Sequence, residues 1–305
     1  MNMKARNIDF VCVGFPKCGT TMLYGVLKQH PQISLARGKE TTFFNWHEEF
    51  AYPLKVLKKQ FFGTKWSSNR LHGLVESEFF MNASDMKFFF GKNVKLMFML
   101  RNPVNRLYSA YKMRLRQGQG SIIDLYGKHR KMDTKDLFHL YCEEVVNKNK
   151  SVYEEEFETG NYIKWLNQFQ KEFPKQNMLI LFLEDYKKDP VKEISKIEDF
   201  LGIEEKRLRT DKMENVGNEV SRNYYCSRLN GIFNLFYRKH NAYFVRYPDR
   251  GTKWIALRNR VYGYTLREET ANMDENTKIL CQKYYKKSVE ELEAFMDRDL
   301  KELWF

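Results

Sequence analysis

This chain of 305 residues contains no long hydrophobic segment. No apolar run approaches the ~20 residues that a helix needs to cross a bilayer. Residues 1–6 lead directly into the first apolar strand, which leaves no room for a signal sequence. From these features we expect a cytoplasmic protein without a transmembrane segment.

The sequence also has little that could form a disulfide framework or a metal site. Its five cysteines are odd in number and not closely paired, and it holds no C-x-x-C or H-E-x-x-H spacing. We therefore expect no bound metal. Cys18 follows a lysine at an expected helix N-terminus, where the pKa of a thiol can fall. A nucleophilic role is open there, although a small loop residue is the preferred interpretation.

Linkers and repeats are absent as well. The seven prolines are spread along the chain, and no low-complexity tract separates one part from another, so we expect one domain over residues 1–305. The net charge of +13 indicates which kinds of partner the protein attracts, but it does not predict the fold. It would attract anionic ligands, but the basic residues are scattered among acidic ones and no basic helix stands out. Nucleic acid is therefore not expected as a partner.

The most informative segment is a strand and loop at residues 10–21, FVCVGFPKCGTT. Gly14 and Gly19 keep the glycine spacing of a Walker A loop, in which a lysine would follow the second glycine. Here a threonine follows it, and the lysine stands earlier, at Lys17. The backbone amides of residues 18–21 would still form an anion site at a helix start, with Lys17 touching the group beyond the bound phosphate. An ordinary strand–turn–helix is the alternative.

A second segment, residues 94–100 (VKLMFML), is typical of a strand buried on both faces of a parallel sheet. In a P-loop kinase such a strand ends in an aspartate that helps to hold Mg²⁺, whereas this one ends in Arg101. A helix is expected from Pro103, and Ser109 lies two turns along it, roughly 9 Å further on. Arg101 and Ser109 could grip a second phosphate. The segment indicates a site for two anionic ends and no metal.

Together the two segments resemble the nucleotide-binding motifs of sulfotransferases that use 3′-phosphoadenosine 5′-phosphosulfate (PAPS). In that family a P-K-x-G-T-[TS] loop holds the 5′-phosphosulfate, and an R-N-P-x-x-R-x-x-S-x-Y element holds the 3′-phosphate. The matching residues are Pro16, Lys17, Gly19, Thr20 and Thr21 in the loop, with Cys18 inside it, and Arg101, Asn102, Pro103, Arg106, Ser109 and Tyr111 in the second element. The resemblance implies PAPS as co-substrate, 3′,5′-ADP as product and no metal requirement.

The resemblance is closer to the carbohydrate branch of the family, which includes heparan sulfate sulfotransferases and bacterial relatives. Residues 39–45 (KETTFFN) look like the segment that carries this branch's catalytic glutamate, which implies Glu40 as the general base. Residues 160–202 and 273–304 follow its pattern as well. Residues 118–150 and 204–270 match nothing in it. In the family, a loop before the C-terminal helix contacts the donor. Its counterpart here lies before Met273, and the resemblance, which is loose in this loop, implies Arg267 as a candidate donor contact.

Strands that alternate with helices predict an α/β fold, a P-loop-type open parallel sheet of about four to five strands flanked by helices. The ligand is expected at the carboxyl ends of the strands. After the strand at residue 10, further strands are predicted at 74–76, 94–100 and 177–183. Helices are predicted at 19–30, 52–62, 83–90, 103–116, 134–148, 161–172, 190–202, 222–240 and 274–297.

Sulfuryl transfer from a phosphate to an acceptor oxygen or nitrogen sets three tasks. Negative charge on the leaving phosphate must be stabilised, and Lys17 is the candidate for this role. The acceptor must lose a proton to a base, for which Glu40 is the candidate. The donor must be held at its far end by Arg101 and Ser109. The alternative for Glu40 is a surface carboxylate that is paired with Lys39.

Other residues could serve the same site. Glu76 and Glu78 follow another strand and could contact the acceptor or orient a base. His47 and His72 are minor candidates for the base. Two aromatic residues near Glu40 could line the acceptor cleft: Phe44 and Trp46.

We therefore expect a sulfotransferase (EC 2.8.2) that moves the sulfuryl group of PAPS to a hydroxyl or amine of a carbohydrate or glycolipid acceptor. A small lipid or sterol-like alcohol is an alternative acceptor. An ATP-dependent P-loop small-molecule kinase and a basic nucleotide- or polyanion-binding module are the competing functions.

Overall fold

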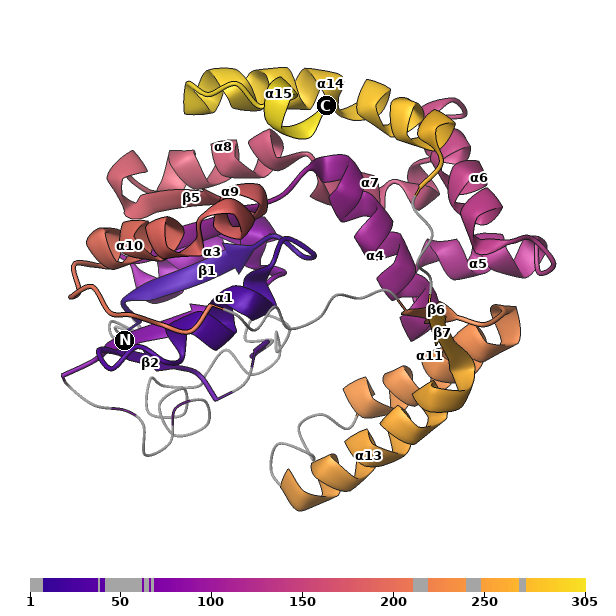
Figure 1. The fold of residues 1–305 in the computed structure, drawn as a ribbon, viewed down its shortest axis with the longest axis horizontal. Coiled ribbons are helices and arrows are strands. Elements are labelled where there is room, and N and C mark those ends of the chain that lie inside the picture. The colour runs from indigo at the N-terminus through magenta and orange to yellow at the C-terminus, as the bar shows by residue number, and fades with distance from the viewer. Residues whose placement is uncertain are drawn as a thin grey trace. The chain divides into compact units, whose positions relative to one another are not determined.

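The computed structural model describes residues 8–37, 39–41, 62, 66, 69–210, 219–239, 248–268 and 273–305 (Figure 1). The chain divides into two compact units, and each is assembled from segments that are distant in the sequence. Unit 1 comprises residues 1–106, 161–216 and 287–305, and unit 2 comprises residues 107–160 and 217–286. The single domain over residues 1–305 stays a prediction.

Unit 1 contains a five-stranded parallel sheet with the strand order β2-β3-β1-β4-β5. Its strands are β1 (Phe10–Gly14), β2 (Ile33–Leu35), β3 (Leu71–Val75), β4 (Lys95–Leu100) and β5 (Met178–Phe182). Every residue of β1 is buried, as are the last five of β4, because helices cover both faces of the sheet. The predicted α/β fold with about four to five parallel strands is confirmed.

Strand β3 begins three residues before the predicted 74–76, and it includes a glycine where two strands approach closely. Gly73 pairs with Phe10 of β1, and a Cβ atom added to Gly73 would stand 2.1 Å from Phe10 Cζ. Only glycine fits beneath that ring. Strand β2 is short and was not predicted.

The helices of unit 1 are α1 (Thr20–Leu27), α3 (Ala83–Phe90), α8 (Tyr162–Glu172), α9 (Leu183–Lys188), α10 (Pro190–Leu201) and α15 (Lys301–Trp304), with short 3-10 turns at Phe79–Met81 and Lys175–Asn177. Four of them, α1, α3, α8 and α10, match predicted helices, whereas α9 and α15 were not predicted. Helix α3 packs on α8, α1 on β2 and β3, and α9 and α10 on β5 (Figure 1). Gly202 ends α10 with a φ of 73°, the left-handed conformation of a C-terminal glycine.

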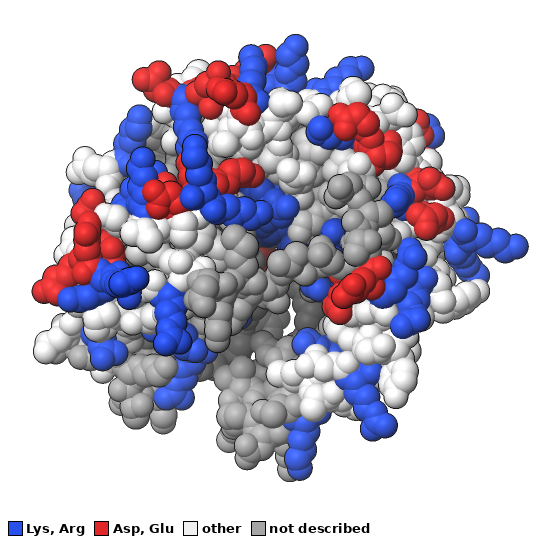
Figure 2. All heavy atoms as spheres, in the orientation of Figure 1, with Lys and Arg blue, Asp and Glu red and all other residues white. Residues whose placement is uncertain are grey.

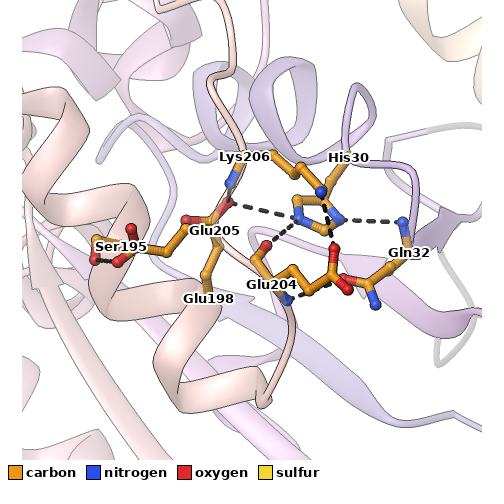
Figure 3. A network of polar contacts seen from close by, with 7 residues as sticks. All are labelled: His30, Gln32, Ser195, Glu198, Glu204, Glu205 and Lys206. Atoms are coloured by element: carbon orange, nitrogen blue, oxygen red, sulfur yellow. Dashed lines mark hydrogen bonds and ion pairs between the residues drawn. The ribbon is translucent and has the colours of Figure 1, made fainter.

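A polar network ties the chain after α10 to the turn between α1 and β2 (Figure 3). His30 Nδ1 accepts from Gln32 N at 3.1 Å, so Nε2 carries the proton and donates to Glu204 O at 3.0 Å. Gln32 Oε1 accepts from Glu204 N at 2.9 Å. Glu198 Oε1 accepts from Lys206 N at 3.0 Å and lies 3.5 Å from His30 Nε2. The network fixes residues 204–206 against the turn between α1 and β2.

Unit 2 is mostly helical. It holds α5 (Ser121–Lys128), α6 (Thr134–Val146), a 3-10 turn at Ser151–Tyr153, α7 (Glu155–Thr159), α11 (Tyr224–Lys239) and α13 (Pro248–Thr265), and an antiparallel pair formed by β6 (Glu219–Ser221) and β7 (Leu266–Glu268). Helices α4 (Pro103–Gln117) and α14 (Glu275–Met296) run through both units. Helices α5, α7 and α13 were not predicted, and the helix predicted at 52–62 lies outside the described residues, apart from Phe62. Within the described part of the chain, no helix is both long enough and apolar enough to cross a membrane.

Candidate active site

Polar residues follow every strand of the unit 1 sheet at its carboxyl end. Because carboxyl ends of parallel strands meet at one edge, residues far apart in the sequence become neighbours there. In strand order these residues are Glu40 after β2, Glu76 and Ser77 after β3, the loop of residues 15–19 after β1, Arg101 after β4 and Glu184 after β5.

The loop after β1 has an unusual backbone. Lys17 has a φ of 68°, a left-handed conformation that is uncommon for a residue with a side chain and often marks a functional site. Gly19 has a φ of 93°, and a Cβ atom added there would stand 2.8 Å from Leu183 Cδ1. Phe15 N donates to Met99 O at 3.0 Å, which ties the loop to β4. Both the lysine and the second glycine therefore have conformations imposed by this loop.

Helix α1 begins at Thr20 without a side-chain cap at Gly19 and without an acidic residue in its first turn. The first amides of a helix have no intrahelical partner and carry the positive end of its dipole, so the amides of residues 19–21 can receive an anion. The amide of Cys18 is different, because it donates to Phe15 O at 3.2 Å. The predicted set of four amides is therefore reduced to three.

The pKa of the Cys18 thiol is raised, not lowered as a nucleophilic role would require. The thiol is completely buried, with Sγ 3.4 Å from the hydroxyl of Tyr162. Burial raises the pKa of Cys18 to about 11, and neighbouring positive charges from Arg106 and Arg101 offset only part of that rise. Cys18 is a neutral, packed loop residue, as the preferred interpretation of the sequence had it.

Two arginines bind consecutive carbonyl groups of the loop. Arg101 Nη1 donates to Lys17 O at 3.2 Å, and Arg106 Nε donates to Pro16 O at 3.2 Å. Arg106 is only 1% exposed. The hydroxyl of Tyr162 donates to Arg101 O at 2.8 Å, which holds the start of this segment from the other side. The structure thus brings Arg101 and Lys17 together, while Arg106 supports the loop from the interior.

Ser109 and Arg267 belong to unit 2. Ser109 is half-buried on α4, in the same helix as Arg106. Arg267, on β7, donates to Thr134 Oγ1 at 3.2 Å and lies 3.7 Å from Asp133 Oδ2, at the start of α6. Their roles as donor contacts stay predictions.

Glu40 and Glu76 form a reciprocal pair of contacts between the segments after β2 and β3. Glu40 Oε1 accepts from Ser77 N at 3.3 Å and also from the Ser77 hydroxyl. Glu76 Oε1 accepts from Thr41 N at 2.7 Å. Lys39 Nζ lies 2.8 Å from Glu40 Oε1, so the alternative pairing suggested by the sequence is also present. The Glu40 side chain remains 28% exposed, and it is held in place from two sides.

Glu76 is buried, with 1% of its surface exposed. Burial raises the pKa of Glu76 to about 8, although hydrogen bonds from Thr41 oppose the rise, and the nearby Glu40 adds to it. A side chain without exposed surface cannot reach an acceptor. Of the two roles considered for Glu76, orienting the Glu40 segment is the one that its burial permits. Glu78 is exposed.

His72 has a structural environment. It is buried near the start of β3, with its ring stacked on Trp66 at 3.7 Å between centroids and Nδ1 3.6 Å from Asp9 Oδ2. The start of a parallel strand lies at the edge opposite to its carboxyl end, so the geometry argues against His72 as the base. His47, Phe44 and Trp46 lie outside the described residues.

Three residues that support the site were not singled out from the sequence. Ser77 holds Glu40, Tyr162 contacts both Cys18 and Arg101, and Glu184 Oε1 accepts from Asn102 N at 2.9 Å. Ser77 and Glu184 each lie two residues after the end of a strand. This position was the signal in the sequence that could have identified them as site residues.

Comparison with known proteins identifies sequences and structures that are similar to this chain. Residues 7–253 match a family model described as the sulfotransferase domain. The chain is 27% identical over 206 residues to heparan sulfate glucosamine 3-O-sulfotransferase 3B1 of Mus musculus, which covers 66% of this chain and 47% of that protein. It is 25% identical over 233 residues to heparan sulfate glucosamine 3-O-sulfotransferase 5 of Mus musculus, with coverage of 73% and 60%. The chain thus spans roughly half the length of the curated relatives it matches.

A solved structure shares the fold. The crystal structure of a sulfotransferase from Alicyclobacillus acidocaldarius superimposes with a TM-score of 0.58 and 19% identity, covering 96% of this chain and 97% of that one. The family model covers the displaced-lysine loop, the Glu40 segment and Arg101. This chain belongs to the sulfotransferase domain family.

Proposed function

We propose that the protein transfers the sulfuryl group of PAPS to a hydroxyl or amine of a carbohydrate or glycolipid. One observation carries this proposal: Arg101 is bonded to the carbonyl of Lys17 at the sheet edge that also holds Glu40. A guanidinium, the loop that carries Lys17 and a carboxylate at this edge suit a donor with two anionic ends and an acceptor that must lose a proton.

The residues present fit the donor. The amides of residues 19–21 and the side chain of Lys17 would hold the 5′-phosphosulfate, since unpaired amides at a helix start favour anions. Arg101 and Ser109 would hold the 3′-phosphate, for which the fork of N–H groups on an arginine is well suited. When bound, PAPS supplies a sulfuryl group already attached to a phosphate that can leave.

Lys17 is the candidate for stabilising that departure. As the sulfur–oxygen bond to the phosphate breaks, negative charge grows on the bridging oxygen, and a fixed cation lowers the energy of that state. The left-handed backbone of Lys17 is set by a loop that Arg101 and Arg106 hold through the carbonyls of residues 17 and 16. The loop therefore presents this lysine from a rigid base.

Glu40 is the candidate general base. It would take the proton of the acceptor hydroxyl or amine as the new bond to sulfur forms, a role that typically contributes about 10²–10⁴-fold to rate. Ser77 and Lys39 hold one carboxylate oxygen, Oε1. The contacts to this oxygen orient the group, so the second oxygen is the one proposed to accept the proton.

The acceptor class rests on the relatives. Two of them are named as sulfotransferases of heparan sulfate glucosamine, which supports a sugar acceptor for this chain. A small lipid or sterol-like alcohol is the alternative acceptor.

Calorimetry tests the donor assignment. We expect 3′,5′-ADP to bind in the presence of EDTA, while ATP with Mg²⁺ binds weakly or not at all. Binding of Mg-ATP alone would instead support a P-loop kinase. The acceptor is then sought by mass spectrometry, as a product that gains one SO₃ group in a cell extract supplied with PAPS. Donor binding with no sulfated product from any extract would favour a nucleotide-binding module.

A further inference from the structure

Helix α11 in unit 2 has its polar side turned toward the protein. Ser227 and Asn230 are fully buried, and Asn234 is nearly so. Asn230 Nδ2 donates to Arg116 O at 3.0 Å, and Asn234 Nδ2 donates to Gln117 O at 2.9 Å, so these side chains bind the end of α4. Thr265 Oγ1 donates to Asn230 Oδ1 at 2.8 Å. Hydrogen bonds, rather than apolar packing, attach this face of α11.

The opposite side of α11 is apolar and exposed. In a water-soluble protein the apolar stripe of a surface helix normally faces the core. Here the arrangement is reversed. The exposed residues are Tyr225 at 67%, Leu229 at 42%, Ile232 at 64%, Leu235 at 67% and Phe236 at 43%, whose ring also packs on Trp254 of α13 at 4.5 Å between centroids. Positions 225, 229, 232 and 236 follow helical spacing and form one stripe, which Leu235 flanks. We call these five residues the α11 apolar face.

Cations accompany this face, on α11 and on the neighbouring helix α13 (Figure 1). Every charged side chain described on the two helices is basic: Arg228, Lys253, Arg258 and Arg260. Leu257 and Tyr264 of α13 are exposed as well, at 46% and 72%. In the lower right of Figure 2, the described atoms over α13 include Lys and Arg but no Asp or Glu. The expectation that no basic helix stands out was therefore wrong for this part of the chain.

We propose that the α11 apolar face, with these cations, binds the surface of an anionic lipid bilayer. A helix with a strongly apolar side lies in the headgroup region and buries that side among the acyl chains, and basic residues add attraction to anionic lipids. A second copy of this surface would set cations against cations. An anionic glycan would pair with the cations but leave the leucine and isoleucine side chains in water. The bilayer is the partner that satisfies both features.

Vesicle sedimentation tests this proposal without measuring activity. The full chain is mixed with vesicles of equimolar phosphatidylglycerol and phosphatidylcholine, or of phosphatidylcholine alone. We expect binding to the anionic vesicles, weakened when NaCl rises from about 0.05 M to about 0.5 M because salt screens the charges. Ile232→Ser combined with Leu235→Ser should reduce the affinity at least about tenfold. Arg228→Gln combined with Arg260→Gln should reduce it about fivefold for each cation removed.

The matched control is Val191→Ser on α10, which removes an apolar side chain that is 71% exposed elsewhere in the chain; it should bind vesicles as the unmodified protein does. Circular dichroism and 3′,5′-ADP binding verify that each variant is folded. The proposal is overturned if the protein stays in the supernatant with anionic vesicles, or if the Ile232 and Leu235 pair can be replaced without loss of binding. It is equally overturned if light scattering finds a dimer that the same pair of substitutions converts to monomers, or if heparin is bound and vesicles are not.

Discussion

The guanidinium of Arg101 donates from Nη1 to the main-chain carbonyl of Lys17 at 3.2 Å, although 84 positions separate the two residues in the sequence. Strands β1 and β4 are direct neighbours in the sheet, so the loop after one and the residue after the other meet at the same edge. The Arg101 guanidinium is thereby fixed to the backbone of the loop that carries Lys17. A guanidinium held next to a helix start favours anions, which is the electrostatic basis for the predicted donor site.

Replacing Arg101 should distinguish binding of the donor's 3′-phosphate from binding of its 5′-phosphate. We expect Arg101→Ala to weaken 3′,5′-ADP about tenfold or more, because a charge-assisted bond to a phosphate is lost. The affinity for 5′-AMP, which lacks the 3′-phosphate, should change little. Calorimetry with both nucleotides measures the difference. Equal losses for the two ligands would mean that Arg101 only supports the Lys17 loop. Ser109→Ala should weaken 3′,5′-ADP alone, by about fivefold or less.

Replacing Glu40 should affect the chemistry but not the donor. Glu40→Gln keeps the size of the side chain and an acceptor for Ser77 but cannot take a proton, so kcat should fall about 10²–10⁴-fold. The Kd for 3′,5′-ADP should stay within about twofold. Glu172→Gln is the matched control, since Glu172 pairs with Lys87 on the outer surface of unit 1. Full sulfation by Glu40→Gln would remove this residue from the mechanism.

Glu76 should make stability depend on pH. Its pKa of about 8 in the folded protein exceeds the value of about 4.3 in an unfolded chain. The folded protein therefore holds this proton more tightly, and the resulting stability is fully present below about pH 4 and is lost as pH rises through 8. Between about pH 5 and pH 8.5, the free energy of unfolding of the unmodified protein should fall relative to Glu76→Gln by on the order of 4 kcal/mol.

Urea denaturation of both proteins at the two pH values measures this difference. Glu76→Gln retains an oxygen for the amide of Thr41, so the comparison isolates the ionisation. Glu172→Gln should keep the pH dependence of the unmodified protein. Identical pH profiles for Glu76→Gln and the unmodified protein would show that Glu76 is already ionised when folded.

Alanine substitutions at two glycines with left-handed backbones should distinguish the cost of backbone strain from the cost of steric overlap. Gly19→Ala and Gly202→Ala both force a side chain into a left-handed conformation, at φ values of 93° and 73°, which costs about 1 kcal/mol or more. A Cβ atom at Gly202 has no neighbour within 4 Å, whereas one at Gly19 would be 2.8 Å from Leu183 Cδ1. Thermal denaturation should find Gly19→Ala less stable than Gly202→Ala by about 1 kcal/mol or more. Only Gly19→Ala should weaken 3′,5′-ADP. Equal melting temperatures would contradict the tight packing of the loop.

Cys18 should resist alkylation. Four of the five cysteines are buried, and Cys226 is partly exposed, so iodoacetamide at pH 8 should modify Cys226 first in the folded protein. The high pKa of Cys18 keeps it protonated, and the thiolate is the reactive form. Peptide mass spectrometry gives the order of modification. Rapid labelling of Cys18, or loss of activity in Cys18→Ser with donor binding intact, would revive a nucleophilic role.

Local patterns in the sequence predicted the parts of the site that are continuous in the chain. Residues 10–21 contain a strand, an anion-binding loop and a helix start in succession, and the structure has β1, the loop and α1 there. The helix predicted at 83–90 matches α3 at both ends. Strand and helix periodicities depend on neighbours a few positions away, which is why these assignments needed no knowledge of the rest of the fold.

The sequence by itself determined the family, the α/β class and the order of strand, loop and helix around Lys17 and Arg101. Only the tertiary structure decided that Ser77 holds Glu40, that Cys18 is buried beside Tyr162, and that α11 turns its apolar face outward. Each of these depends on burial and on contacts between segments that are distant in the chain. Helical periodicity shows that α11 has two faces, but which of them meets solvent is set by the polar ends of other helices that it packs against.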